Sequence, residues 1–400
     1  MKIKCLLLAV AAWGGLFTAV RPVCAQSWKL SDAPTEFWHA VASSADGSHL
    51  VAVALRGPIY TSSDGGATWM ATSTPSAAWS GVASSADGTK WVAVAAETTN
   101  PSDDPGGIYT STDSGATWTL TSARYAPWRP VASSADGTKL AAAIRFGTIY
   151  TSADSGATWT ATSAPDQDWI SLACSADGTK LVATEANNPM PSDGLIYTSA
   201  DSGATWTQTS APNGYWNCVA SSADGTKLVA AGGPYGPVNN IYTSTDSGAT
   251  WTNTSAPSVF WDSIASSADG GKLVAAGDHG PLYTSPDSGA TWTSNSGPSE
   301  LWWWSVASSA DGSKLVATVY NGGIYTWQSS PAPLLRVSPS GTNVVISWAV
   351  PSMNFVLQQN SDLNRANWTD VTTAPTVTNL QNQVVLPAPT GNAFYRLLSR

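Results

Sequence analysis

Two regular series of aspartates are the residues with the clearest capacity for chemistry in this 400-residue chain. One series lies in Asp-Gly pairs. The other lies in the phrase Ser-x-Asp-x-Gly-x-x-Trp, at Asp64, Asp113, Asp154, Asp201, Asp246 and Asp287. Paired carboxylates can act as general acid and base, and converging carboxylates can bind calcium, but one carboxylate per turn supplies neither arrangement. We expect these side chains to accept hydrogen bonds from amides of their own turns, a structural role.

The segments that carry these aspartates repeat along the chain. The phrase Trp-x-x-Val-Ala-Ser-Ser-Ala-Asp-Gly-Thr-Lys-Leu-Val-Ala recurs in seven versions, the first at Trp38 and the last at Trp303. Most continue to Ile-Tyr-Thr-Ser and the second aspartate turn. An Asp-Gly pair between β-forming runs predicts a hairpin, because glycine adopts positive φ without steric cost. Four strands in each ~40 to 50 residues is the period of a propeller blade.

The repeats predict an all-β chain with two folded parts. We expect a seven-bladed β-propeller over residues 26–328, a linker over 329–333 and a small β-sandwich module over 334–400. The seventh repeat ends near Trp327 without an outer strand, whereas residues 27–34 resemble the outer-strand phrase at 205–212. We therefore expect the N-terminal strand to close the last blade, which removes an exposed edge.

The six second turns match the Asp-box (BNR) pattern, so the chain resembles the Asp-box propellers. These include bacterial sialidases, xyloglucanases, sortilin-type receptors and the photosystem II assembly-factor type. The resemblance covers roughly residues 27–328 and implies fold more than function. The C-terminal part resembles modules that end many secreted bacterial proteins, which implies surface attachment or glycan contact; a stabilising cap without a ligand is the alternative.

A sialidase, as the resemblance implies, needs three arginines for the substrate carboxylate, a Tyr-Glu pair and an acid/base aspartate. The expected propeller holds only Arg56, Arg124, Arg129 and Arg145. Other acids that could serve a glycosidase stand in variable loops: Glu97, Asp103, Asp104, Asp166, Asp168, Glu185, Asp193, Asp278 and Glu300. Near-identical blades are untypical of a catalytic site, so we expect no catalytic residues. A sialidase-like glycoside hydrolase or lyase remains the alternative function.

The expected binding site lies on the face opposite the aspartate turns, where the loops vary. A tryptophan opens each inner strand there: Trp38, Trp79, Trp128, Trp169, Trp216, Trp261 and Trp303. The next residue varies and includes His39, Arg129, Asn217, Asp262 and Trp304. These residues are the candidate ligand contacts of a scaffold that binds a protein or a glycan. The aromatic ring could stack on sugar or peptide groups, but identical repetition favours tryptophans that pack between blades.

The net charge and the N-terminal segment indicate which partners and which compartment to expect. The net charge of −9 would repel a phosphate backbone, so we expect no nucleic-acid partner. Residues 1–25 predict a signal peptide cleaved after Ala25, with a lipoprotein acylated at Cys24 as the alternative. No other apolar run reaches the ~20 residues that span a bilayer. We expect an exported monomer, periplasmic, cell-surface or extracellular.

The remaining cysteines and histidines give no cofactor signal. The three histidines lack the spacing of metal ligands, so we expect neither a metal nor a cofactor. Cys174 and Cys218 lie in neighbouring repeats and are offset by three positions, about 10 Å along a strand. We expect two free thiols rather than a disulfide.

Overall fold

The computed structural model describes the backbone of residues 9–11 and residues 28–96, 106–186, 194–233, 240–278, 280–295, 301–328, 335–349, 355–361, 368–378, 381–391 and 393–399. The chain divides into two compact units, Ser27–Gln328 and a second made of Met1–Gln26 with Ser329–Arg400. In the described part all regular structure is strand, and no helix there could cross a membrane. The expected linker 329–333 and most of segment 1–25 lie outside the described residues.

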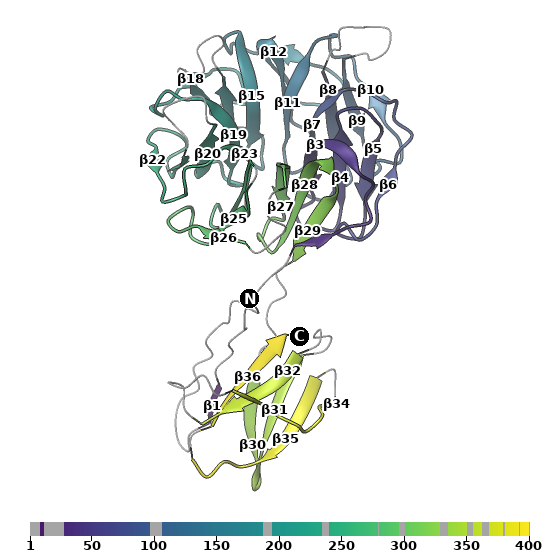
Figure 1. The fold of residues 1–400 in the computed structure, drawn as a ribbon. Coiled ribbons are helices and arrows are strands. Elements are labelled where there is room, and N and C mark those ends of the chain that lie inside the picture. The colour runs from purple at the N-terminus through teal and green to yellow at the C-terminus, as the bar shows by residue number, and fades with distance from the viewer. Residues whose placement is uncertain are drawn as a thin grey trace. The chain divides into compact units, whose positions relative to one another are not determined.

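The strands of the larger unit pair in chain order into antiparallel sets of four. The first strands are β3 (Glu36–Ser43), β7 (Trp79–Ser84), β11 (Trp128–Ser133), β15 (Gln167–Cys174), β19 (Trp216–Ser221), β23 (Trp261–Ser266) and β27 (Trp303–Ser308). The second strands are β4 (Leu50–Ala54), β8 (Trp91–Ala95), β12 (Leu140–Gly147), β16 (Leu181–Glu185), β20 (Leu228–Gly232), β24 (Leu273–Gly277) and β28 (Lys314–Gly322). The third strands are β5 (Ile59–Ser62), β9 (Ile108–Ser111), β13 (Ile149–Ser152), β17 (Ile196–Ser199), β21 (Ile241–Ser244), β25 (Leu282–Ser285) and β29 (Ile324–Gln328). The short fourth strands are β6 (Met70–Ala71), β10 (Thr119–Leu120), β14 (Thr160–Ala161), β18 (Thr207–Gln208), β22 (Thr252–Asn253), β26 (Thr293–Ser294) and β2 (Lys29–Leu30). Figure 1 shows these sets, the blades, following one another around a ring, which is a β-propeller.

A circuit of backbone hydrogen bonds joins the first hairpin turns of the blades. The amide of Ala45 donates to the carbonyl of Ala86 at 2.7 Å, and the same bond links each turn to the next. The last bond runs from the amide of Ala310 back to the carbonyl of Ala45, also at 2.7 Å. The circuit therefore closes on itself after seven turns, and it ties every blade to both of its neighbours.

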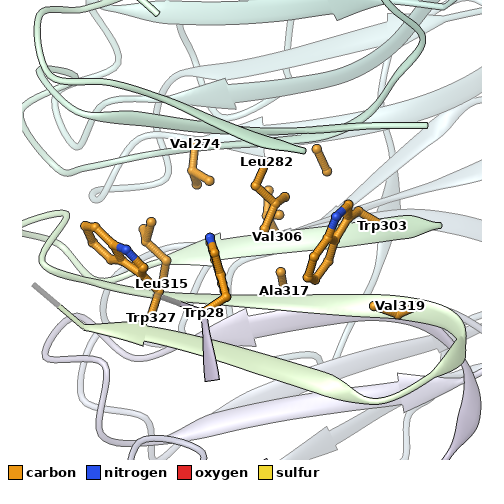
Figure 2. Packing of buried hydrophobic residues seen from close by; sticks show 10 residues of the cluster. Trp28, Val274, Leu282, Trp303, Val306, Leu315, Ala317, Val319 and Trp327 are labelled. Carbon is orange, nitrogen blue, oxygen red and sulfur yellow. The ribbon is translucent and has the colours of Figure 1, made fainter. Parts of the chain in front are cut away.

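The N-terminal strand completes the last blade, as the sequence predicts. In β2, Lys29 pairs with Thr326 of β29 and Leu30 with Tyr325. Trp28 precedes this strand and is buried, with its ring centroid 5.9 Å from that of Trp303 and 6.4 Å from that of Trp327. Figure 2 shows the three indoles in one apolar cluster. Strand pairing and packing together hold the two ends of the ring.

Burial on both faces explains the apolar second strands. All five residues are buried in β4, β8, β16, β20 and β24. A strand covered on both faces has no polar alternation, because neither set of side chains meets water. The fourth strands, by contrast, are exposed. The core therefore lies between neighbouring blades.

The second aspartate turns are held by their own hydrogen bonds. Asp201 Oδ1 accepts from the Thr205 amide at 2.8 Å and from Ser199 Oγ at 2.8 Å, and Oδ2 accepts from Thr205 Oγ1 at 2.6 Å. The equivalent bonds form at Asp64, Asp113, Asp154, Asp246 and Asp287. The Ser202 amide also donates to the Thr179 carbonyl at 2.8 Å, which places both kinds of turn on one face. These carboxylates therefore have a structural role, because they stabilise the turns in which they lie.

Acid is expected to weaken this turn face. Hydrogen bonds from the neighbouring serine hydroxyls, and from turn amides, lower the pKa of Asp136, Asp177 and Asp224 from 3.8 to about 2. A lowered pKa contributes stability that is present above about pH 4 and is lost as the pH falls towards about 2. Denaturant midpoints should therefore decline over this interval, and less steeply in Asp224→Asn. A midpoint that stays level down to about pH 2 would contradict the assignment.

The smaller unit contains two four-stranded sheets. One is formed by β1 (Ala9–Ala11), β36 (Ala393–Ser399), β32 (Phe355–Asn360) and β33 (Thr369–Asp370), and the other by β30 (Arg336–Ser340), β31 (Asn343–Ala349), β35 (Gln381–Pro387) and β34 (Thr376–Thr378). Ile346, Trp348, Leu357, Val384 and Tyr395 share one core, so the sheets form a sandwich. The backbone of β1, inside the expected signal segment, pairs with β36 in this uncleaved chain.

Candidate functional site

Every inner strand has a register shift directly after its tryptophan. In β3 the ladder shifts between Trp38 and Ala40, and the other six inner strands show the same irregularity. A β-bulge of this kind turns a side chain away from the ladder. The residue after the tryptophan is half-buried in every blade: His39, Ser80, Arg129, Ile170, Asn217, Asp262 and Trp304. We call these seven residues the mouth; they lie opposite the aspartate turns.

The inner tryptophans themselves belong to the core. Trp38, Trp79, Trp128, Trp169, Trp216, Trp261 and Trp303 are at most 1% exposed. Each packs at a steep angle against the tyrosine of a third strand, as Trp128 does against Tyr150 with 5.3 Å between ring centroids. The sequence allowed these rings to stack on a ligand but favoured packing between blades, and their burial leaves no ring face accessible. The structure supports the packing alternative.

Neighbouring members of the mouth contact each other's blades. Ser80 Oγ donates to the Trp128 carbonyl at 2.7 Å, and Asn217 Nδ2 donates to the Trp261 carbonyl at 2.8 Å. Asn217 Nδ2 also lies 3.5 Å from Asp262 Oδ1. Burial, with the nearby Asp278 carboxylate, raises the pKa of Asp262 to about 7. Among the predicted residues, the structure therefore brings Asn217 and Asp262 together.

An aromatic group stands beside the mouth where the last blade meets the first. The ring of Tyr320 lies 5.3 Å from Phe37, 5.8 Å from Trp302 and 5.0 Å from Trp304, measured between centroids. Phe37 and Trp302 are each 44% exposed. We call these four residues the aromatic rim. Trp304 also packs against His39, with 5.8 Å between ring centroids, which joins the rim to the mouth.

A charged group stands where the third blade meets the fourth. Asp168 Oδ1 lies 3.5 Å from Nη1 of Arg129 and 3.5 Å from Nε of Arg145. Asp168 is buried, whereas the two arginine side chains are 34% and 51% exposed. Burial raises the pKa of Asp168 and the two guanidinium charges oppose that rise. We call these three residues the charged rim.

His39 connects the mouth to the charged rim as well. Burial and the charge of Arg129 lower the pKa of His39 to about 4, so the imidazole is neutral at pH 7. The structure therefore brings His39 into contact with Trp304 of the last blade, and the charge of Arg129, from the third blade, acts on the same imidazole.

Glu185 is an unusual residue for its position. It ends β16, where the other repeats carry only uncharged residues at the position paired with the inner tryptophan: Ala54, Ala95, Ile144, Gly232, Gly277 and Val319. Its Oε1 accepts from the Leu195 amide at 2.9 Å, and its buried Oε2 has no hydrogen-bond partner among the described residues. Burial raises the pKa of Glu185 to about 7. A buried carboxyl with a raised pKa, next to other charged groups, is a candidate functional residue.

Neutralising Glu185 should stabilise the fold at alkaline pH. Its raised pKa means that the ionised carboxylate opposes folding, and this penalty grows from about pH 4 and is complete above about pH 7. Glu185→Gln keeps an acceptor for the Leu195 amide. We therefore expect a higher denaturant midpoint than wild type at about pH 8 and matching midpoints near pH 4. A difference that does not change with pH would contradict this account.

The thiols and the loop acids complete the comparison with the predictions. Cys174 and Cys218 are free, and Cys174 Sγ donates to the Ser133 carbonyl at 3.0 Å. Burial raises the pKa of Cys174 to about 12. The loop acids Glu97, Asp103, Asp104, Asp193 and Glu300 lie outside the described residues. Within the described ranges, no group of three His, Cys, Asp or Glu side chains could hold a metal.

Phe37, Trp302, Tyr320 and Arg145 are site residues that the sequence reasoning missed. A signal for two of them was available, because the residue before each inner tryptophan also changes from repeat to repeat: Phe37, Ala78, Pro127, Asp168, Tyr215, Phe260 and Trp302. Tyr320 and Arg145 lie on the extended ends of β28 and β12, and no local sequence pattern predicts that these two strands are longer than their counterparts.

Comparison with known proteins identifies similar folds but assigns the chain to no family. No protein-family profile and no curated protein sequence matches the chain. Among solved structures, "YCF48 bound to D1 peptide" is similar, with 16% identity and a TM-score of 0.57 over 77% of this chain and 98% of that one. A GH74 xyloglucanase from Xanthomonas campestris has 16% identity and a TM-score of 0.60 over 81% of this chain and 59% of its own. YCF48 from Cyanidioschyzon merolae has 15% identity and a TM-score of 0.57 over 75% and 98%.

Proposed function

We propose that the protein is a binding scaffold that recognises a segment of a protein partner at the mouth and its two rims. The observation that carries this proposal is the aromatic rim, in which two large aromatic residues are each 44% exposed beside a ring of unlike and mostly polar side chains. Exposed apolar groups with a polar border are typical of interaction sites. Tryptophan, tyrosine and arginine are also the residues that most often dominate binding energy at interfaces.

The similar structures include propellers with two different kinds of ligand. One of the similar propellers is described as bound to a D1 peptide, and another is a glycoside hydrolase. At 16% identity these likenesses carry the fold alone, so the choice between a protein and a glycan rests on the rims. The rings of Phe37 and Trp302 meet that of Tyr320 at 63° and 64°, and the ring of Trp304 meets it at 36°, so the four rings form no single flat platform. Such a surface suits an apolar side chain better than a flat sugar ring.

Removing an exposed indole should weaken binding and leave the fold intact. Peptides selected on the purified protein from a random displayed library would be titrated against wild type and Trp302→Ala. We expect an affinity loss of about tenfold or more, the size of an interface hot spot. Leu120→Ala is the matched control, because Leu120 is 53% exposed on the outer strand β10. Equal affinity in wild type and Trp302→Ala would overturn the proposed site.

A glycoside hydrolase is the second candidate, and two carboxyls favour it. Glu185 and Asp262 both have a pKa of about 7, which suits a general acid at neutral pH. Product release from xyloglucan and other polysaccharides, measured for wild type, Glu185→Gln and Asp262→Asn, distinguishes the two functions. Turnover that disappears in either variant would establish the enzyme, and absence of turnover beside peptide binding supports the scaffold.

Export, assembly state and repeat family complete the proposal. We propose that residues 1–25 are removed as a signal peptide, that the mature protein is an exported monomer and that its six second turns are Asp-box repeats. The intact mass of protein recovered outside the cytoplasm should correspond to a chain that starts at Gln26. A mass that retains Met1 would contradict the cleavage.

A further inference from the structure

Two blade junctions differ from a simple propeller because an extra ladder bridges them. At the first junction, β28 continues past its own blade and pairs with β3, with Tyr320 opposite Phe37 and Gly322 opposite Glu36. At the second junction, β12 continues and pairs with β15, with Arg145 opposite Asp168. Phe37 and Tyr320 of the aromatic rim stand on the first ladder, and Arg145 and Asp168 of the charged rim stand on the second. Residues on paired strands are more precisely placed than residues on loops.

The two junctions lie on opposite sides of the mouth. Following the ring from the first junction, the blades that begin with β3, β7 and β11 precede the second junction. The blades that begin with β15, β19, β23 and β27 complete the circuit. Three blades on one side and four on the other put the rims across the axis from each other. A ligand that touches both rims must cross the mouth.

The charged rim carries an excess of positive charge. Two guanidinium groups share the single carboxylate of Asp168, so these three residues keep one positive charge when all are ionised, and the neighbouring Glu185 adds a negative charge only as the pH rises through its raised pKa of about 7. Both arginines are partly exposed and each is 3.5 Å from the shared oxygen, which leaves donors free for a second carboxylate. This excess stands on a chain whose net charge is −9. An anionic group is therefore attracted to this rim more than to its surroundings.

Arginine and lysine are segregated within the propeller. Lys90, Lys227 and Lys272 reach from one blade to the Asp-Gly turn of the next and donate to its backbone carbonyls. The arginines, in contrast, lie on or beside the variable loops: Arg56, Arg124, Arg129 and Arg145. Arginine is the residue suited to bidentate carboxylate recognition. These three lysines therefore stabilise the junctions between blades, whereas the arginines lie where a ligand could be recognised.

We propose that the site binds an extended acidic peptide across the mouth, with an apolar side chain in the aromatic rim and a carboxylate on Arg129 and Arg145. This inference rests on the proposed scaffold function and gives the partner its chemistry. His39 packs on Trp304 at the aromatic end, and Ser80 of the next blade donates to the carbonyl of Trp128, the residue before Arg129. The peptide therefore needs a spacer that crosses these mouth residues between its apolar and acidic ends.

Synthetic peptides test this assignment directly. We would measure, by fluorescence anisotropy on the purified full chain, peptides with an aromatic residue at one end and glutamates at the other, joined by spacers of increasing length. Analogues would replace the glutamates by lysine, the glutamates by glutamine, or the aromatic residue by serine. We expect an optimum at one spacer length, a loss of about tenfold or more in each analogue and weaker binding at higher salt.

Matched variants separate this inference from the scaffold proposal. Arg145→Ala should lower affinity for the glutamate peptide to that of its glutamine analogue, whereas Arg56→Ala, an exposed arginine on another loop, should not. Trp302→Ala should lower affinity for both peptides. Binding that depends on Trp302 but is indifferent to Arg145 and to peptide charge would overturn the inference and keep the scaffold. Binding of an acidic polysaccharide but of none of the peptides would overturn both.

Discussion

Replacing Trp28 with alanine lowers the free energy of unfolding by about 3–5 kcal/mol, the usual cost of emptying a buried tryptophan site. Trp28 is 7% exposed and lies against Trp303 and Trp327, so the substitution opens a cavity where the two ends of the ring meet. It also loosens β2, the outer strand that covers β29. An uncovered strand can pair with another chain, so association should accompany the loss of stability.

Denaturant unfolding and size-exclusion chromatography check both parts of this result. Trp302→Ala is the control, because that ring is 44% exposed and its removal leaves no enclosed cavity. We expect the control to unfold within about 1 kcal/mol of wild type. If Trp28→Ala unfolds like the control and stays monodisperse, the closure described here is not what holds the ring.

Replacing Trp216 with alanine has an effect of similar size on stability and no specific effect on binding. The indole is fully buried, its Nε1 donates to the Pro212 carbonyl at 3.1 Å, and its ring lies 5.4 Å from that of Tyr242. Loss of this packing should cost about 3–5 kcal/mol. Any variant protein that folds should still bind with the affinity of wild type, because Trp216 presents no surface to a ligand.

Thermal melting, with affinity corrected for the folded fraction, tests this expectation. Trp304→Ala supplies the opposite pattern, since that residue is half-buried in the mouth and contacts His39 and Tyr320. It should lower affinity more than stability. If the Trp216→Ala protein folds but has lost binding, the inner tryptophans contribute to the binding site after all.

The fold was accessible from sequence because its determinants are local and repeated. Each Asp-Gly turn and each Ser-x-Asp-x-Gly turn specifies a hairpin by itself, and the resemblance of residues 27–34 to 205–212 predicts the closure. The register shift after Trp38 has no such signal, because the same residues could pair either in a regular ladder or with a bulge. The direction of His39 and of Arg129 therefore had to come from the structure.

The site was less accessible because it depends on contacts between distant residues. Phe37 and Tyr320 are paired neighbours although nearly the whole propeller lies between them in sequence. Arg145 meets Asp168 only because β12 extends beyond its blade. The position after each tryptophan varies from repeat to repeat in the sequence, but the identical tryptophans could be assigned to the core or to a ligand site only by their exposure.

The closed circuit of alanine hydrogen bonds has a topological consequence. Since the bond from Ala310 to Ala45 equals that from Ala45 to Ala86 at 2.7 Å, the circuit has no first or last member. The chain could therefore begin at another blade and still form every one of these bonds. Circular permutation is tolerated where new ends fall in exposed loops, and the loop that carries the exposed Arg56 is such a place. In a permuted chain that begins there, β2 and β29 would lie within one continuous segment only if the two were linked, since they now belong to distant segments.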